Sequence, residues 1–317
     1  MYGILNLNKP IGPTSRECVN RVGRVLPGIK LAHAGTLDPL ASGVLVLLVG
    51  PAVRLMEEVH TFDKEYIGTF RMGQSSPSGD LETEVTDSLI PEGLGAQHLL
   101  DTLPSFLGAI EQRPPAYSAV RVDGKRAHVQ ARRGVAVDVP MRSITIHALE
   151  LLDFAFPEFT LRVSCGTGTY MRSLGSDIAR SLGTEAVMTR LQRTRVGPFT
   201  IDNSVSLEAI ESPEWDQQVL PATLGAHNMP QWCVDDSVMR RILDGQRLPF
   251  SDIAGAAAIT EVGANAGDCL GANIDTQLDR RGAVVDVKGV LRAIVERKED
   301  GRWRCHKGIA HWDVLPS

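Results

Sequence analysis

The sequence predicts an α+β fold in which a larger domain is followed by a smaller, β-rich one. Segments with the apolar spacing of strands recur through the first two hundred residues, and segments with helical spacing stand between them. An acidic, proline-bearing stretch at 212–230 then precedes short strand-like segments separated by turn sequences. Because 317 residues are enough for about two domains, we expect domains at 1–211 and 231–317 with a linker at 212–230.

The first expected elements lead into one short loop. Residues 3–8 have a strand pattern, and Thr14 and Glu17 form a capping box at the start of a segment with helical apolar spacing. The later run 44–49 is apolar, uninterrupted and closed by a Gly-Pro pair, so we expect a buried strand there. The loop that precedes this strand is therefore framed by regular elements.

Patterns of the same kind place the remaining elements. The C-terminal boundary of the helix expected at 97–106 is uncertain from the sequence, because Pro104 disrupts helical hydrogen bonding. Strands are expected at 64–73, 144–152, 159–165, 283–287, 290–295 and 303–307, helices at 97–106, 170–182 and 238–243, and loops at 74–80 and in the Ala/Gly-rich span 254–272.

The loop at 33–43 displays one carboxylate, Asp38. Gly35 and Gly43 permit backbone angles that other residues resist, while Pro39 fixes its own φ and disfavours a helical conformation at Asp38. Two interpretations fit these residue types equally well. Asp38 is either a turn former that bonds its own backbone or an acid held out for chemistry.

The formal net charge of −5 is unevenly distributed along the chain. Lys and Arg gather in the stretches 9–30, 121–142 and 162–195, whereas 201–236 holds seven acidic residues and no Lys or Arg. Segregated charge allows a basic footprint on an acidic protein, and such a footprint binds phosphates whatever the net charge. Each stretch alone is compatible with a solvated surface, but three of them favour a polyanionic partner.

Several other classes of protein are disfavoured. No apolar run approaches the ~20 residues of a membrane helix, and the first residues lack a signal-peptide pattern, so we expect a cytoplasmic protein without membrane contact. The five cysteines form no C-x-x-C pair, which argues against a disulfide framework and a zinc ribbon. Cys305, His306 and His311 are better explained as isolated residues of a β-rich tail, so no metal is expected.

Residues around Asp38 resemble the catalytic motif of the TruB-type tRNA pseudouridine synthase family, with Gly35-Thr36-Leu37-Asp38-Pro39 after His33 and before an apolar strand. The resemblance covers roughly residues 3–199, and the tail from Trp232 resembles the family's small PUA-like domain more weakly. Serines and a proline replace threonines at 73–80, and Ala127-His128 replace a Leu-Tyr pair. The other matching blocks are Asn8-Lys9-Pro10, Lys64-Glu65-Tyr66, Pro115-Ala116-Tyr117-Ser118-Ala119, Gly124-Lys125-Arg126, Gly168-Thr169-Tyr170-Met171-Arg172-Ser173 and Leu191-Gln192-Arg193-Thr194-Arg195.

The resemblance implies a catalytic domain with a mixed, largely antiparallel sheet flanked by helices, which isomerises uridine-55 in the T-loop of tRNA. It implies that Asp38 is the nucleophile, that Arg172 pairs with it, and that Tyr66 lies against the target base and moves a proton. Leu191 would line the uracil pocket, and His33 would fill the stack that the flipped base leaves. The expected phosphate contacts are Lys9, Lys125, Arg126, Arg132 and Arg193.

A carboxylate suits this isomerisation. An Asp of ordinary pKa is almost fully ionised at pH 7, so it needs no neighbouring base to act as a nucleophile. A paired arginine such as Arg172 keeps that charge stable in a dry pocket. The reaction requires no cofactor. The expected partner is tRNA through its T-arm, with no obligatory protein partner and a monomeric enzyme.

Two other functions remain open. A noncatalytic RNA-binding or tRNA-folding protein on the same fold would keep the basic stretches but would not need Asp38, Tyr66 and Arg172 together. A guide-RNA-directed synthase of the related archaeal and eukaryotic branch would need partner proteins. A glycosidase is disfavoured, because no second carboxylate is clearly paired with Asp38 in the sequence.

Overall fold

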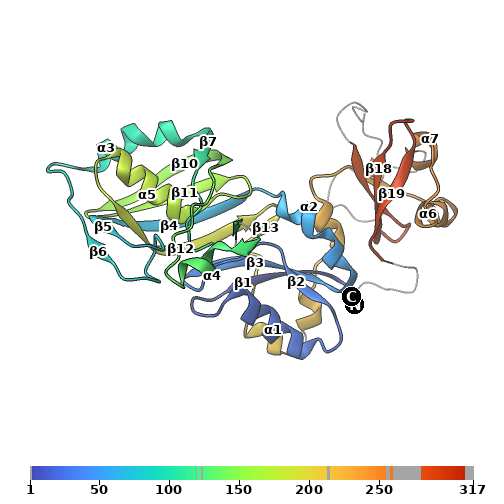
Figure 1. The fold of residues 1–317 in the computed structure, drawn as a ribbon. Helices are drawn as coiled ribbons and strands as arrows, with labels where there is room; N and C mark the ends of the chain where they lie inside the picture. The colour runs from blue at the N-terminus through green and yellow to red at the C-terminus, as the bar shows by residue number, and fades with distance from the viewer. Residues whose placement is uncertain are drawn as a thin grey trace.

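The computed structural model describes residues 2–118, 120–122, 124–212, 215–254, 258–259 and 280–310. Most of the Ala/Gly-rich span, expected as a loop, and His311 in the tail lie outside these ranges. The described chain forms two bodies around separate sheets, a larger N-terminal one and a smaller C-terminal one (Figure 1). This arrangement confirms the predicted α+β fold with a β-rich second domain.

The larger sheet is mixed and largely antiparallel, as predicted. Its order is β14-β1-β3-β12-β4-β11-β10-β7, with β2 paired to β3 and β13 paired to β12. Within the described residues, β1–β14 and β12–β3 are its parallel pairs. Its strands are β1 (Gly3–Lys9), β2 (Leu31–His33), β3 (Ala41–Val49), β4 (Lys64–Met72), β7 (Gly108–Gln112), β10 (Arg142–Ala155), β11 (Glu158–Cys165), β12 (Ala186–Val196), β13 (Phe199–Thr200) and β14 (Val205–Ser206).

Strand β3 is buried on both faces, which explains its uninterrupted apolar run. Leu45 belongs to the cluster beneath α1 (Ser15–Val25), and Val46 belongs to a second cluster on the opposite face. Helix α1 begins at the predicted capping box, in which Thr14 and Glu17 cap each other. The expected order of strand, helix and buried strand is therefore confirmed.

The far half of the larger sheet packs against α5 (Met171–Ser181) and α3 (Ala96–Thr102). The helix expected at 97–106 is divided after Thr102, where the chain continues as the 3-10 helix η2 (Leu103–Phe106). Pro104 accounts for the change, because it has no N–H to continue the α-helical pattern.

Strand β12 was missed by the sequence prediction. Its arginines at positions 190, 193 and 195 interrupt the apolar pattern on which a strand is recognised. The strand pairs with β3 on one side and with β4 on the other. It therefore joins the strand that follows Asp38 to the strand that carries Tyr66.

Two small hairpins extend from the larger sheet. The loop expected at 74–80 begins with β5 (Gln74–Ser75), which pairs with β6 (Thr86–Asp87). The second hairpin pairs β8 with β9 and leads directly into a short helix. Its elements are β8 (Arg121–Val122), β9 (Lys125–Arg126) and α4 (Ala127–Ala131).

The smaller sheet has the order β16-β15-β17-β18-β19. Its last three strands confirm the prediction within two residues at each end. The helix expected from residue 238 begins at Asp236 instead, because Asp235 accepts hydrogen bonds from the N–H groups of Ser237 and Val238. The elements are β15 (Gln231–Cys233), α6 (Asp236–Leu243), α7 (Phe250–Ala254), β16 (Ala258–Ile259), β17 (Arg281–Val285), β18 (Leu291–Arg297) and β19 (Trp303–Gly308).

Residues 215–230 of the expected linker pack between the two sheets. Leu220 and Ile4 exchange backbone hydrogen bonds of 2.9 and 2.7 Å. Ala226 lies in one hydrophobic cluster with Ile4 of the larger sheet and Ile294 of the smaller one. The domain boundaries at 211 and 231 stay a prediction. Short helices of this region and of the adjoining surface are η1 (Gly50–Leu55), α2 (Met56–His60), η3 (Ala209–Glu211), η4 (Trp215–Gln218) and η5 (Ala222–Ala226).

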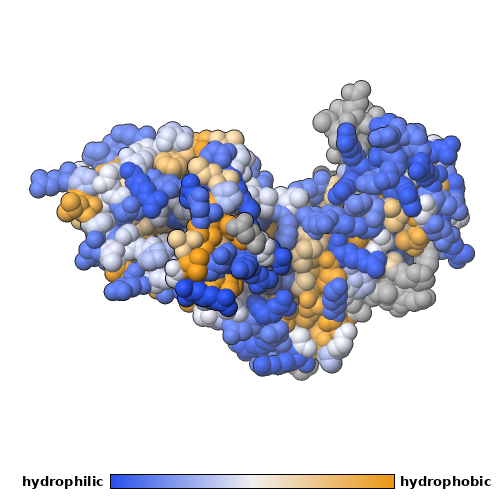
Figure 2. Space-filling view, in the orientation of Figure 1, coloured by the Kyte–Doolittle hydropathy of each residue, from blue (hydrophilic) through white to orange (hydrophobic). Residues whose placement is uncertain are grey.

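The visible surface of the smaller body is mainly hydrophilic (Figure 2). Apolar residues on this face gather over the larger body and below the junction of the two bodies. Among the described helices, none combines the length and the apolar character required to cross a membrane.

Alanine at position 43 is predicted to disrupt the packing of β3 on β12. Gly43 has φ +101°, and an added Cβ would lie 2.2 Å from the backbone oxygen of Arg193. Gly12 has a similar φ of +112° but open space around an added Cβ, so Gly12→Ala is the matched control. In urea titrations, Gly43→Ala should lower the free energy of unfolding by about 3 kcal/mol or more, and Gly12→Ala by about 1 kcal/mol. Equal losses would contradict the close packing.

Candidate active site

The loop that carries Asp38 is fixed by neighbours on two sides. The backbone N–H of Gly12 donates to the carbonyl oxygen of Pro39 at 2.9 Å. At the start of α1, the Ser15 hydroxyl donates to the Leu37 carbonyl oxygen at 3.0 Å and accepts from the Leu37 N–H at 2.8 Å. The turn before α1 and the first residue of that helix therefore hold the loop in one position.

Asp38 faces an arginine from a distant part of the chain. Its Oδ2 lies 3.1 Å from Nη2 of Arg172, which stands in the first turn of α5. The Asp38 side chain is 37% exposed, whereas the Arg172 side chain is 6% exposed. Within the described residues, no backbone N–H of the loop donates to the Asp38 carboxylate. This geometry favours the displayed acid over the turn former.

A second carboxylate shares this arginine, and the sequence analysis missed it. Asp80 is 2% exposed, and its Oδ2 lies 3.5 Å from Arg172 Nη1. Asp80 Oδ1 accepts from the Ser78 hydroxyl at 2.6 Å and from the Glu82 N–H at 3.0 Å. Arg172 also donates to the carbonyl oxygens of Ser78 at 2.9 Å and Tyr117 at 3.0 Å. The only signal in the sequence was an acid beside Ser and Gly, and ordinary turns often contain such a combination.

The environment changes the acidity of Asp38. Burial raises the pKa of this carboxyl above its ordinary value, and the positive charge of Arg172 opposes the rise. Asp80 and Glu82 raise the pKa further, while Lys9 lowers it. The Asp38 pKa therefore lies above the ordinary value on which the sequence-based expectation rested. Arg172, beside it, favours the ionised carboxylate.

Tyr66 and Leu191 lie in the apolar cluster next to the Asp38 loop. Both residues are 8% exposed, and the same cluster includes Ala41, at the end of the loop. Leu191 of β12 pairs directly with Ala41 of β3. The structure thus brings these two side chains to the same region as Asp38 and Arg172, although the four residues are widely separated in the sequence.

His33 ends β2 and is partly buried. Its Nδ1 is buried without a hydrogen-bond partner among the described residues. Burial lowers the pKa of His33, and the charges of Arg16 and Arg193 lower it further. A neutral ring with an unpaired nitrogen is able to stack on a base or to form a hydrogen bond with one.

The prediction that Lys9 and Arg193 contact phosphates is wrong for this structure. Lys9 is fully buried, and its Nζ donates to the carbonyl oxygen of Ala41 at 2.6 Å. Arg193 is 1% exposed and donates to the carbonyl oxygens of Val44 at 2.7 Å and Gly35 at 3.1 Å. Both cations therefore donate to backbone carbonyl groups of the Asp38 loop and of the start of β3, and so satisfy buried acceptors there.

Lys125, Arg126 and Arg132 are exposed, as phosphate contacts require. Lys125 and Arg126 form β9 of the second hairpin, and neither belongs to an ion pair within the described residues. Nη2 of Arg132 lies 2.5 Å from Oε1 of Glu82. This pair ties the segment after α4 to the turn that holds Asp80.

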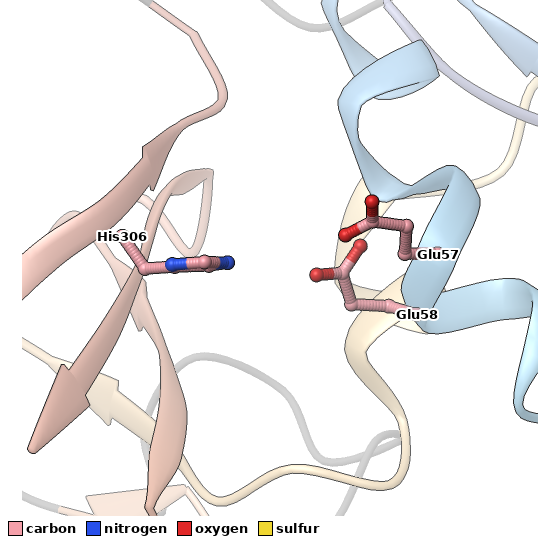
Figure 3. A group of neighbouring side chains, drawn as sticks. All are labelled: Glu57, Glu58 and His306. Atoms are coloured by element: carbon pink, nitrogen blue, oxygen red, sulfur yellow. The ribbon is translucent and has the colours of Figure 1, made fainter.

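Glu57, Glu58 and His306 form a group whose ligand atoms lie close enough to hold a metal ion (Figure 3). The two acids come from α2, and the histidine comes from β19. However, Nζ of Lys307 lies 2.6 Å from Glu57 Oε2 and 2.9 Å from Glu58 Oε1. Nδ1 of His306 lies 3.3 Å from Glu296 Oε2. The lysine already supplies the positive charge, so we assign this group as an ionic link between the two bodies.

Replacing Arg172 is predicted to raise the pKa of Asp38 further. Because the arginine favours the ionised carboxyl, Arg172→Gln should move the Asp38 titration to higher pH, and Arg172→Lys should move it less. Carbon-13 NMR of aspartate-labelled protein measures the titration, with the signal assigned by its loss in Asp38→Asn. Arg162→Gln removes an exposed arginine paired with Glu150 and serves as the control. An unchanged Asp38 titration in Arg172→Gln would contradict the ion pair.

Comparison with known proteins finds one family. Residues 24–171 match the TruB family pseudouridylate synthase (N terminal domain), and residues 172–230 match the tRNA pseudouridylate synthase B C-terminal domain. Proteins named tRNA pseudouridine synthase B from Rhodopirellula baltica and Synechocystis sp. are 38% and 40% identical to this chain over 92% of its length. The matches cover 86% and 100% of those proteins. A protein of the same name from Burkholderia mallei is 38% identical over 82% of this chain and 87% of its own.

Solved structures share the fold. A crystal structure of a Cbf5-Nop10-Gar1 complex contains a chain 25% identical to this one, with a TM-score of 0.71 over 98% of this chain and 86% of that chain. A structure of an H/ACA RNP bound to a substrate RNA containing 2′-deoxyuridine contains a chain 23% identical to this one. Its TM-score is 0.70 over 98% of this chain and 86% of that chain. The family matches span residues 24–230, including Asp38, Tyr66, Arg172 and Leu191, and this chain belongs to the TruB family of pseudouridylate synthases.

Proposed function

We propose that this protein is a tRNA pseudouridine synthase that isomerises uridine-55 in the T-loop of tRNA. The observation that carries the proposal is the 3.1 Å pairing of Asp38 with Arg172 beside the apolar cluster of Tyr66 and Leu191. Membership of the TruB family, and relatives named tRNA pseudouridine synthase B, support the reaction and the substrate class. The proposed position within tRNA rests on the motif resemblance around Asp38.

In the proposed reaction, Asp38 forms a covalent adduct with the nucleoside, at C1′ of the ribose in the simplest path. The C1′–N1 bond breaks and its electrons leave with the uracil. The uracil turns in the pocket, and its C5 bonds to C1′ while the C1′–O bond to Asp38 breaks and returns its electrons to the carboxylate. C5 then loses a proton and N1 gains one. Substrate and product are isomers, so the chemistry needs no oxidant or reductant. Asp38 is the nucleophile, Arg172 favours its ionised form, and Tyr66 moves a proton.

The target base must leave its stack to reach Asp38. Extrusion of a nucleotide costs a few kcal/mol, which contacts in the pocket and at the vacated position offset. Leu191 supplies an apolar wall for the uracil, and the partly buried His33 is placed to occupy the vacated stack. The exposed Lys125, Arg126 and Arg132 are our candidates for phosphate contacts in the T-arm.

A guide-RNA-directed function is the main competitor. The likeness to the chain in the Cbf5-Nop10-Gar1 complex supports a shared fold. The higher identity of 38–40% to proteins named tRNA pseudouridine synthase B favours an enzyme that acts on tRNA. We propose that it works as a monomer without an obligatory protein partner. A purely noncatalytic RNA-binding protein would have no need of a carboxylate that pairs with a buried arginine and remains partly exposed to solvent, as Asp38 does.

Asp38→Asn is predicted to abolish turnover while leaving tRNA binding intact. The amide keeps the shape of the side chain but is a poor nucleophile, so release of tritium from a 5-tritiated uridine transcript should fall at least about 10³-fold. Filter binding should show the affinity for tRNA within about threefold of the wild type. The control is Asp177→Asn, which replaces a partly buried acid on α5 and should retain activity. Full turnover by Asp38→Asn would refute the nucleophile assignment.

RNA binding is predicted to weaken steeply with salt. The affinity should drop by orders of magnitude between ~50 and ~200 mM salt if several phosphates are engaged. The test is the slope of the logarithm of the binding constant against the logarithm of the salt concentration. Replacing both Lys125 and Arg126 by alanine should reduce the size of this slope by about two, or about one for each lost phosphate contact. Arg71→Ala, at an exposed arginine paired with Glu158, should leave the slope unchanged. A slope that is flat, or unaffected by the double substitution, would contradict this binding surface.

A further inference from the structure

A row of residues crosses the larger sheet next to the Asp38 loop. Lys9 of β1 pairs with Gly43 of β3, Gly43 pairs with Arg193 of β12, and Arg193 pairs with Tyr66 of β4. Directly paired residues on adjacent strands are neighbours whose side chains interact. Arg193 is therefore the immediate neighbour both of the strand that follows Asp38 and of the tyrosine in the same site.

Among the described residues, no acid neutralises the buried charge of Arg193. The residue is 1% exposed, and among the described residues no carboxylate oxygen lies within 4.0 Å of its guanidinium. Its Nε and Nη2 donate to the carbonyl oxygens of Val44 and Gly35, one on each side of Asp38. A buried charge without a counterion is costly, and carbonyl groups compensate it only in part. Such a cation at the centre of a site calls for an anionic partner.

The hydroxyl of Tyr66 is the group in position to become that partner. Burial raises the pKa of Tyr66, and the positive charge of the directly paired Arg193 opposes the rise. Cys165 of β11 and Asp38 are the other ionisable groups that act on this hydroxyl, and both raise the pKa. Among these groups, Arg193 alone favours the phenolate.

We infer that Arg193 is a positioning residue for Tyr66, which fixes the tyrosine hydroxyl relative to the Asp38 loop and stabilises its phenolate form. The inference rests on the proposed function, in which Tyr66 moves a proton. The phenolate takes the proton from C5: the C5–H bond breaks, its electrons restore the C5–C6 double bond, and the phenol O–H bond forms. The phenol then releases that proton to solvent while N1 takes one from solvent, so atoms and charge balance.

The direct test measures the ionisation of residue 66. Tyr66 is replaced by 3,5-difluorotyrosine, whose phenol ionises at lower pH, and its fluorine-19 NMR shift is followed against pH. Arg193→Met should move the midpoint upward by about one pH unit or more, because a nearby charge has an effect of that size even at an effective dielectric near 20. Arg193→Lys should recover most of this shift. Arg71→Met, on the same strand as Tyr66 but exposed, is the control and should cause no shift.

Kinetics separate this inference from the proposed function. In single-turnover assays on a T-arm hairpin, Arg193→Met should slow pseudouridine formation about 10²-fold with little change in RNA affinity, and Arg193→Lys should restore part of the rate. The same titration midpoint in Arg193→Met and the unsubstituted background would overturn the inference even if the rate falls. No pseudouridine from the unmodified protein would overturn the proposed function instead, while the fluorine titration would still report on Arg193.

The contact can also be tested without replacing the arginine, should Arg193→Met fail to fold. Nitrogen-15 NMR of arginine-labelled protein detects the Arg193 guanidinium, assigned by the loss of its signals in Arg193→Lys. Removing the hydroxyl in Tyr66→Phe should shift these signals and leave those of exposed arginines such as Arg71 unchanged. Unchanged Arg193 signals in Tyr66→Phe would overturn the inference.

Discussion

The position of Arg172 between two carboxylates is the constraint on which the candidate site depends. One acid, Asp80, is buried and held by its own turn, whereas the other, Asp38, is more than one-third exposed. The arginine therefore has a buried, fixed carboxylate on one side and a more exposed carboxylate on the other. It also joins the loop before β3, the turn near Asp80 and α5, so displacement of any of them would disturb the ionisation of Asp38.

The order of strands explains how the other site residues come together. Strand β12 lies between β3 and β4, parallel to the first and antiparallel to the second. It places Leu191 and Arg193 next to the strand of Asp38 and the strand of Tyr66. Gly43 has no side chain at the closest approach, so the backbone of β12 can pack directly against β3. The sheet thus supports the loop with buried donors, whereas the hairpin of β8 and β9 exposes Lys125 and Arg126 to solvent.

Much of this arrangement was accessible from the sequence. The capping box at Thr14 and the apolar run of β3 predicted their elements through local chemistry, and the matched motifs singled out Asp38, Tyr66 and Arg172. Asp80 was not found because its partner is reached only in the folded chain. Strand β12 and the burial of Arg193 were missed for one reason: a charged side chain indicates a surface position unless tertiary carbonyl groups satisfy its donors.

The most direct test of the proposed reaction is to map pseudouridine in an unmodified tRNA transcript after incubation with the purified protein alone. Carbodiimide labelling followed by mass spectrometry identifies each pseudouridine and its position. We predict stoichiometric conversion of uridine-55 in the T-loop and of no other uridine, without added protein, guide RNA or cofactor. Absence of pseudouridine, or its formation only when partner proteins and a guide RNA are supplied, would contradict the proposed function.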